Sequence, residues 1–486
     1  MTGERPTTAG QARVLVASNR GPVAFTADAA GRLALRRGGG GLVSGTLSVA
    51  QDGGLVWVCA ALSDPDRRAA GQAPAGRLDR AGHDTGGAAV RMLDIDRVVL
   101  DRAYNAVANR TLWFVLHLLY STSSAPTFGP VFRREWEAYE HYNGAFAAAL
   151  AEEASAGATV VIQDYHLTLT PRQLRALRPD LRIAHFSHTP WVSPEYYRLL
   201  PDYVARAVLA GMLGADLVGF LTREWAEAFL ACCAAVLGAR VSRWGVTYAG
   251  RTTRIGVHPL GVDGPQLRER AARKDAAVRT AELAELAGAR RLLVRVDRTE
   301  LSKNIVRGLQ AYRELLRTRP EWRERVLHLV CAYPSRHDLP EYREYTAAVQ
   351  RIAEDIREEF ATDGWDPVRL DVSDDYPRSL AALSLAQVLV VNPIRDGMNL
   401  VAKEGPVLAM DGVALVLSRE AGACAELGSA ALVVNPYDVT ETAEAMHAGL
   451  SMPPAERRSR TERLVAAATA LPPQTWFREL LGAVRG

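Results

Sequence analysis

The chain has 486 residues, of which 48% are hydrophobic and 23% are charged, a composition typical of a globular protein with about two or three domains. Its 58 basic and 55 acidic residues nearly balance, so we predict no extended basic surface for nucleic acid. The five cysteines lack CxxC spacing, the N-terminus lacks an apolar leader and no apolar run is long enough to span a membrane. These features argue against a disulfide framework, structural zinc and membrane insertion, and we expect a cytoplasmic protein.

Short apolar strands alternate with helical segments along the whole chain. The strands are expected at 14–17, 159–162, 182–186 and 217–220, and then at 292–296, 326–330, 388–391, 414–417 and 432–434. This alternation predicts parallel sheets flanked by helices. Two such series predict an α/β protein with two doubly wound, Rossmann-like domains. Because ligands of such sheets bind beyond the carboxyl ends of the strands, we expect the chemistry in an interdomain cleft.

A stretch punctuated by Gly and Pro, residues 255–262, precedes a polar segment rich in Arg, Glu and Ala. We place the domain boundary there, which gives domains at 1–255 and 256–455 and a C-terminal helical segment at 456–486. Residues 64–89 are rich in Gly, Ala, Arg and Asp, and we expect loops or a flap there.

The first predicted strand is followed by Ser18-Asn19-Arg20 and by four glycines at 38–41. Consecutive glycines let backbone NH groups approach a phosphate at the start of a helix, but taken alone they favour a flexible turn. No register of the run gives GxGxxG, which disfavours a dinucleotide-dependent dehydrogenase.

Polar side chains follow two later strands, in Gln163-Asp-Tyr-His166 and Ser187-His-Thr-Pro-Trp191. Sugar hydroxyls need fixed donors and acceptors, and an aromatic ring can cover the apolar face of a sugar. These strand ends therefore suit a sugar site, although a structural histidine is the alternative for each His.

In the second half, Arg298 and Lys303 follow the strand at 292–296 and precede a helix. Two fixed cations can stabilise a departing diphosphate without a metal ion. The alternative is a solvated helix start with surface charges.

The most informative stretch is 392–404, in which a strand leads through Asp396-Gly397 into a helix. Backbone NH groups at 397–400 can face a phosphate, with the helix dipole behind them. Glu404 lies about two turns further on and can accept hydrogen bonds from vicinal hydroxyls such as those of ribose. An ordinary Asp-Gly turn with a surface Glu is the alternative.

With these motifs the chain resembles the trehalose-6-phosphate synthase family, most specifically through Arg-Asp-Gly-Met-Asn-Leu-Val-Ala-Lys-Glu at 395–404. The resemblance implies the GT-B architecture, with the C-terminal helix packing back on the first domain. It also implies transfer of glucose, with retention, from GDP-glucose or UDP-glucose to glucose 6-phosphate, with no metal or cofactor. No enzyme nucleophile is needed, because the leaving oxygen helps to take the proton.

The resemblance also implies roles for single residues. At the catalytic centre His188 lies beside the donor glucose, Arg298 and Lys303 bind the diphosphate, and Asp396 binds sugar hydroxyls. The implied donor-binding residues are Gly40, Gly41, Gly397, Met398, Asn399, Leu400, Val401 and Glu404, and the acceptor-binding residues are Arg20, Tyr104, Trp113, Asp164 and Arg336.

The chain departs from the commoner family pattern at Gln163, Cys59 and 187–191. These variants resemble an actinomycete-like branch in which GDP-glucose can replace UDP-glucose, so we predict GDP-glucose as the preferred donor. Alternatives are a glucosylglycerol-phosphate synthase, a pseudo-glycosyltransferase and a catalytically silent sugar-phosphate sensor. The retained cations and Asp396 argue against the sensor, and association into a homo-oligomer stays open.

Overall fold

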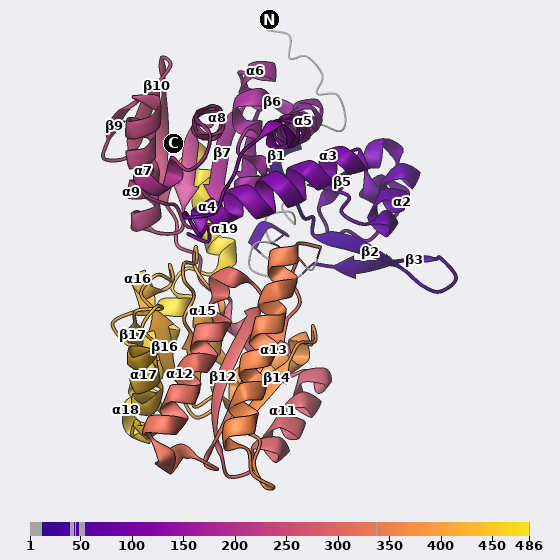
Figure 1. Cartoon of the computed structure of the whole chain (residues 1–486). Coiled ribbons are helices and arrows are strands. Elements are labelled where there is room, and N and C mark those ends of the chain that lie inside the picture. The colour runs from indigo at the N-terminus through magenta and orange to yellow at the C-terminus, as the bar shows by residue number, and fades with distance from the viewer. Residues whose placement is uncertain (1–11, 39–42, 44, 48–53, 337, 486) are drawn as a thin grey trace, which may run out of the picture. The chain divides into compact units, whose positions relative to one another are not determined.

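The computed structural model describes residues 12–38, 43, 45–47, 54–336 and 338–485, and the chain divides into two compact units (Figure 1). The first contains the described residues up to Leu260 and those from Pro473 onward, and the second is Gly261–Pro472. Helix α18 (Pro454–Thr469) therefore belongs to the second unit, and helix α19 (Pro473–Arg485) to the first. Among the described helices, none combines the length and the apolar character that crossing a bilayer requires.

The first unit is built on a sheet in the order β5-β4-β1-β6-β7-β8-β11-β10-β9. Strands β5 to β11 in this order pair in parallel, and β10 and β9 extend the sheet in antiparallel fashion. The strands are β1 (Ala12–Ala17), β4 (Leu55–Ala60), β5 (Ala89–Leu93), β6 (Ala154–Gln163), β7 (Arg182–Ser187), β8 (Leu217–Phe220), β9 (Arg240–Ser242), β10 (Gly245–Tyr248) and β11 (Arg251–Val257), with a separate hairpin of β2 (Val23–Ala27) and β3 (Leu33–Arg37).

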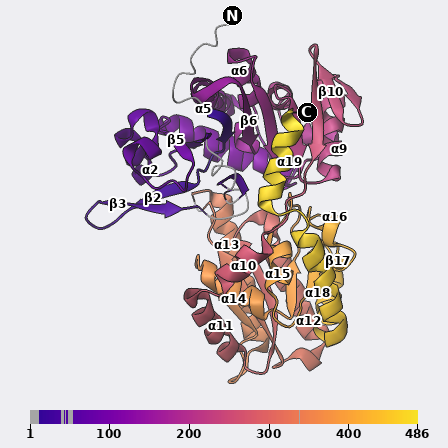
Figure 2. The same cartoon turned by 180° about the vertical axis from the view of Figure 1, so that it is seen from behind.

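Helices of the first unit lie between these strands in the chain. They are α2 (Asp64–Gln72), α3 (Arg97–Asp101), the π-helix η3 (Arg102–Leu112), α4 (Trp113–Leu116), α5 (Pro130–Glu153), α6 (Thr170–Leu177), α7 (Pro194–Tyr197), α8 (Asp202–Met212) and α9 (Arg223–Cys232). Helix α5 packs against β1 and β4, and α19 packs against β6, β7 and β8. The last helix of the chain therefore covers the strands that carry the polar strand ends (Figure 2).

Helix α2 corrects the expectation of loops at 64–89. Ser63 accepts a hydrogen bond from the backbone of Asp66, and Asp66 accepts one from the backbone of Ser63, which forms a capping box. Asp66 also accepts a hydrogen bond of 2.7 Å from the backbone NH of Phe25. The helix is therefore specified by its cap and by one buried carboxylate rather than by an apolar stripe.

The second unit has a fully parallel sheet in the order β14-β13-β12-β15-β16-β17. All four residues of β15 are buried, as expected of a parallel strand that is covered on both faces. The strands are β12 (Arg291–Arg298), β13 (Val326–Tyr333), β14 (Val368–Asp371), β15 (Val388–Val391), β16 (Ala414–Ser418) and β17 (Leu432–Val434). The prediction of two helix-flanked parallel sheets is confirmed.

Two helical layers cover this second sheet. Helix α12 (Ile305–Thr318) packs between α13 (Pro340–Phe360) and α17 (Val439–Ser451) on the face nearer the viewer in Figure 1. The other layer contains α10 (Gly264–Ala271), α11 (Lys274–Ala287), α14 (Tyr376–Leu385), α15 (Val401–Leu408) and α18 (Figure 2), and α16 (Cys424–Leu427) is a short connecting helix. Side chains of α12, α13 and α17 form one buried core with β12, β13 and β15, and burying one such Leu or Ile side chain contributes ~1.5–3 kcal/mol.

Candidate functional site

His188, the predicted catalytic histidine, follows β7 in the first unit and pairs with Gln163 at the end of β6. Its Nε2 lies 2.8 Å from Gln163 Oε1, and its backbone NH donates to Asp164 Oδ1 at 3.2 Å. Burial lowers the pKa of His188 to about 4, so the ring is neutral near pH 7. The contact fixes the orientation of the imidazole ring against the Gln163 amide. Trp476 of α19 lies against the ring at 5.9 Å between centroids.

Asp164 has φ +72° and ψ 173°. A non-glycine residue with positive φ is uncommon, and such strained residues cluster at functional sites. This conformation turns the chain just after the carboxyl end of β6, where the Asp164 carboxylate accepts a hydrogen bond from the backbone NH of His188. Two predicted site residues are thus brought into direct contact.

The predicted phosphate ligands Arg20 and Tyr104 also lie together. Arg20 Nη2 is 3.5 Å from the Tyr104 hydroxyl, and the Tyr104 ring stacks on His166 with centroids 5.6 Å apart. Tyr104 lies on the π-helix η3, an irregularity that is frequent at functional sites. His166, the last residue of the strand-end motif Gln163-Asp-Tyr-His166, therefore lies beside Tyr104 as a further candidate site residue.

Trp113 follows η3, and its ring stacks on His117 at 3.8 Å and packs against Tyr165 at 5.5 Å. The Tyr165 hydroxyl donates to Asn109 Oδ1 at 2.8 Å. The contacts of Trp113 and Asn109 with Tyr165, and of Tyr104 with His166, therefore join η3 to the strand end at 163–166. The predicted donor residues Gly40 and Gly41 lie outside the described residues.

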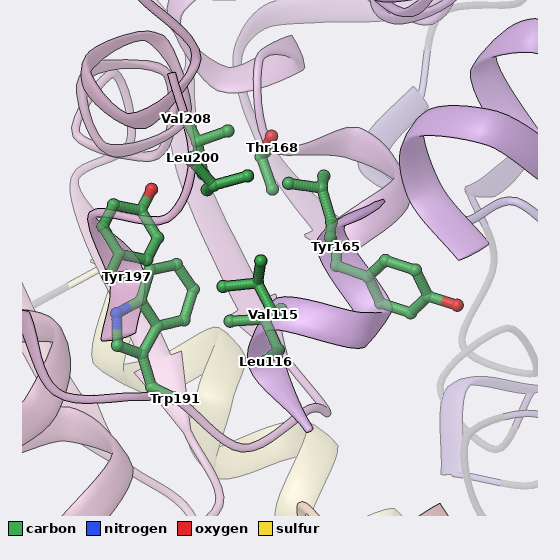
Figure 3. A pocket seen from close by; sticks show the side chains of 9 residues that line it. Val115, Leu116, Tyr165, Thr168, Trp191, Tyr197, Leu200 and Val208 are labelled. Carbon is green, nitrogen blue, oxygen red and sulfur yellow. The ribbon is translucent and has the colours of Figure 1, made fainter. Parts of the chain in front are cut away.

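A small apolar cavity lies behind Tyr165, whose hydroxyl points away from it (Figure 3). It encloses about 10 Å³ of space open to water, which is less than any sugar needs and about what one water occupies. Its walls include Val115, Trp191 and Leu200. We therefore assign it to packing and not to substrate binding.

In the second unit, Lys303 and Asp396 form a close ion pair. Lys303 Nζ lies 2.6 Å from Asp396 Oδ2 and 3.9 Å from Asp297 Oδ1. Burial alone lowers the pKa of Lys303, but the two carboxylates outweigh burial and raise it. Asn399, which has φ +71°, donates to Asp396 Oδ2 at 3.2 Å. The structure thus brings together three residues predicted from two separate motifs.

Arg298 and Arg336 share a carboxylate, Glu300, that the sequence reasoning did not assign. Glu300 Oε1 lies 3.0 Å from Arg298 Nη1 and 3.7 Å from Arg336 Nη1, and Ser335 Oγ donates to it at 2.8 Å. The side chain is fully buried. Burial raises its pKa, yet Arg298, Arg336 and Lys303 together lower it to about 2. In the sequence, its place between Arg298 and Lys303 was the only indication that Glu300 interacts with these cations.

Arg336 therefore lies beside the predicted diphosphate ligands of the second unit, whereas Arg20 and Tyr104 belong to the first unit. Its Nη1 also donates to the Tyr342 hydroxyl at 2.8 Å. The acceptor residues predicted from the resemblance are thus distributed over both units.

The loop between Asp396 and α15 is fixed by backbone contacts. Gly422 NH donates to the Asp396 carbonyl at 3.0 Å, and Ala423 NH donates to the Met398 carbonyl at 2.8 Å. A Cβ at Gly422 would lie 1.9 Å from the Gly397 carbonyl oxygen, so only glycine allows this approach. Leu400 is the residue before α15, which begins at Val401.

Glu404 lies in the first turns of α15 and is partly buried. Burial raises its pKa to about 7. A carboxyl group with a strongly shifted pKa is often found at a binding site, and Glu404 follows the loop 396–400 that is predicted to bind phosphate. In the described part of the chain, no cluster of three or more His, Cys, Asp or Glu side chains is arranged to hold a metal ion.

Comparison with known proteins gives one family match, in which residues 12–485 fit the model of glycosyltransferase family 20. The chain is 33% identical over 465 residues to an Aspergillus niger alpha,alpha-trehalose-phosphate synthase [UDP-forming], covering 94% of this chain and 93% of that protein. It is 32% identical to a probable Arabidopsis thaliana synthase of the same name, but spans only 54% of that relative, and it spans 61% of a Dictyostelium discoideum relative.

Solved structures match over nearly the whole chain. The crystal structure of an alpha,alpha-trehalose-phosphate synthase (UDP-forming) from Burkholderia vietnamiensis has a TM-score of 0.82 at 30% identity, with 98% of this chain and 100% of that chain covered. The Burkholderia xenovorans enzyme in complex with glucose-6-phosphate has a TM-score of 0.84 at 26% identity, with 98% and 100% covered. An E. coli protein bound with UDP-2-fluoro glucose also scores 0.84, at 27% identity, with 98% and 99% covered. These matches confirm the predicted GT-B architecture.

Proposed function

The chain belongs to glycosyltransferase family 20, and we propose that it is a retaining glucosyltransferase that joins glucose from a nucleoside-diphosphate glucose to glucose 6-phosphate, giving trehalose 6-phosphate. The observation that carries the proposal is the partly buried cluster of Lys303, Asp396 and Asn399 at the carboxyl edge of the second sheet. Ligands of doubly wound sheets bind at that edge.

In this proposal the second unit binds the donor. Arg298 and Lys303 bind the diphosphate, Asp396 binds hydroxyls of the glucose, and Glu404 binds the ribose. Glu300 holds Arg298 at 3.0 Å, so the guanidinium does not need to be ordered when the ligand arrives. The Lys303 ammonium is similarly held by Asp396.

The acceptor-binding residues of this proposal are those that the family resemblance implies. Arg20, Tyr104 and Arg336 bind the phosphate of glucose 6-phosphate, Trp113 covers the sugar and Asp164 accepts hydrogen bonds from its hydroxyls. His188 lies beside the donor glucose as a neutral hydrogen-bonding group, consistent with its lowered pKa.

The chemistry follows from these positions without an enzyme nucleophile. As the bond from the anomeric carbon to the diphosphate breaks, negative charge grows on the leaving oxygen, and Arg298 and Lys303 stabilise it. The acceptor hydroxyl attacks from the same face and passes its proton to that oxygen, so the configuration is retained. The protein supplies orientation and charge stabilisation.

The base of the donor is a separate question. The relatives compared above are named UDP-forming, which lends no support to a GDP preference. Our prediction of GDP-glucose, and of an actinomycete-like branch, depends only on the variant residues at Gln163, Cys59 and 187–191.

A product assay tests the proposal. Purified protein is incubated with glucose 6-phosphate and either UDP-glucose or GDP-glucose, and the disaccharide phosphate is identified by mass and by its anomeric NMR couplings. Glycerol 3-phosphate in place of glucose 6-phosphate tests the glucosylglycerol-phosphate alternative. Absence of transfer to glucose 6-phosphate from both donors would reject the proposal, and binding without transfer would favour the silent sensor.

A further inference from the structure

We propose that Arg295, a buried arginine in β12, is a positioning residue that holds the Lys303 loop and the end of β15 in register for donor binding. The inference rests on the proposed donor role of Lys303. Arg295 itself is 1% exposed, so we assign it no contact with a substrate.

Arg295 bridges three segments that are distant in the sequence. Its Nε donates to Asp297 Oδ2 at 2.8 Å, its Nη1 donates to Asn392 Oδ1 at 2.5 Å, and its Nη2 donates to the Lys303 carbonyl. Asn392 directly follows β15, and Lys303 ends the short turn η6 (Leu301–Lys303). One guanidinium thus uses all three of its nitrogens to join β12, η6 and the end of β15.

The charges continue from Arg295 to the proposed site in alternating sign. Arg295 and Asp297 are two residues apart on β12, so their side chains lie on the same face of the sheet. The second oxygen of Asp297 lies 3.9 Å from Lys303 Nζ, which in turn contacts Asp396 at 2.6 Å. Burial raises the pKa of Asp297, and the opposing effects of Arg295 and Lys303 offset that rise only in part. Without Arg295, Asp297 would be buried with only the more distant Lys303 as counter-ion.

Gly308 in α12 shows that the fold makes room for this guanidinium. A Cβ at position 308 would lie 2.4 Å from Arg295 Nη1 and 3.2 Å from Asn392 Oδ1. Glycine inside a helix is destabilising relative to alanine, and here the close approach of Arg295 accounts for the glycine. Gly308 and Arg295 are therefore coupled, although 13 positions separate them.

The consequence concerns the geometry of the proposed site. If the guanidinium is lost or displaced, the Lys303 carbonyl and Asn392 lose a shared donor, and the loop that carries Lys303 is free to shift. A displacement of about 1 Å at a charge-stabilising group can lower the rate by ~100-fold.

The test compares Arg295→Met, Arg295→Lys, Gly308→Ala and the double variant Arg295→Met/Gly308→Ala. Gly144→Ala is the matched control, because Gly144 also lies inside a helix and a Cβ there meets nothing within 4 Å. Each protein is characterised by its unfolding midpoint, by its dissociation constant for UDP and GDP, and by kcat and KM for both substrates, measured well below the midpoint.

We expect Arg295→Met to lower kcat and to weaken nucleoside-diphosphate binding, each by ~10- to 100-fold, as for other residues that orient a ligand-binding group. KM for glucose 6-phosphate should change less than threefold, Arg295→Lys should recover part of the loss, and Gly144→Ala should match wild type. Gly308→Ala should be impaired with Arg295 present and cause little further loss in the Arg295→Met background.

Folded Arg295→Met or Gly308→Ala with wild-type kcat and nucleotide binding would overturn the inference, and so would strictly additive effects of the two substitutions. If Arg295→Met does not fold, Gly308→Ala, which retains the guanidinium, decides alone. If the wild-type protein binds UDP or GDP without transferring glucose, the proposed function is rejected. The dissociation constants of the variants for the nucleotide then decide whether Arg295 is a positioning residue. Wild-type protein that binds neither nucleotide would overturn both.

Discussion

Glu404→Gln should stabilise the protein above neutral pH while it weakens nucleotide binding. The pKa of Glu404 rises from 4.5 to about 7 because of burial. Each pKa unit corresponds to ~1.4 kcal/mol, so ionising this side chain costs the fold up to about 3 kcal/mol. Since Glu404 keeps partial exposure, solvent screening reduces the cost to about 2 kcal/mol.

The sign follows from proton linkage. Between about pH 4.5 and pH 7 the unfolded chain releases this proton while the folded protein retains it, so wild-type stability falls as pH rises through that window. Glutamine does not ionise. The variant should therefore gain stability relative to wild type as pH increases, and the gain should level off above about pH 7.

Thermal unfolding of both proteins at several pH values from 4.5 to 8.5 measures the effect. A gain of about 2 kcal/mol in a unit of this size raises the midpoint by roughly 4–8 °C at pH 8 relative to the difference at pH 4.5. Glu358→Gln, an exposed position on α13, is the control and should show a difference independent of pH.

Nucleotide binding should change in the opposite direction. An ionised carboxylate can accept from both ribose hydroxyls, and hydrogen bonds to a charged group contribute ~1.5–3 kcal/mol, so UDP or GDP should bind about 10- to 100-fold more weakly to Glu404→Gln. A midpoint difference that is the same at pH 5 and pH 8 would refute the argument from burial, and unchanged nucleotide affinity would refute the ribose assignment.

Three further substitutions test the site. Arg298→Ala should lower kcat by ~10²- to 10³-fold while leaving the unfolding midpoint almost unchanged. An unchanged kcat in steady-state kinetics would reject the role of Arg298 in stabilising the departing diphosphate. Gln163→Leu removes the side chain that hydrogen-bonds the His188 ring and should reduce kcat more than Gln163→His does. Equal activity of the two variants would contradict that positioning role. Trp476→Ala should destabilise the first unit by ~3–5 kcal/mol, because the indole is fully buried, packs on Phe186 and donates to the His258 carbonyl. Denaturant unfolding, followed by a probe in the first unit, measures the change in stability. A loss of less than about 1 kcal/mol would contradict the prediction.

The parallel strands were predictable because a strand covered on both faces is apolar throughout. Val388–Val391 is such a run, and it lies in the middle of the second sheet. Residues at the carboxyl ends of strands were predictable for the same reason, since the end of the strand fixes where they lie: Asp164 directly follows β6, and Arg298 is the last residue of β12.

Other features required contacts that sequence spacing does not reveal. Arg295 stands inside an apolar strand, and its partner Asn392 is 97 positions away. Glu300 contacts two arginines only because the fold brings Arg336 beside Arg298. Helix α2 lacks an apolar stripe, so only its cap at Ser63 and Asp66 marked it.

The return of α19 to the first unit has a consequence for how the chain is made. The β6–β8 face of the first unit is covered only when Pro473–Arg485 is present, and these residues follow the entire second unit in the sequence. Trp476 and Phe477, which are fully buried in the first unit, are therefore translated only after every residue of the second unit. The first unit can therefore be completed only after Pro473–Arg485 has been translated, and a chain that lacks these residues would lose the packing of Trp476 against His188.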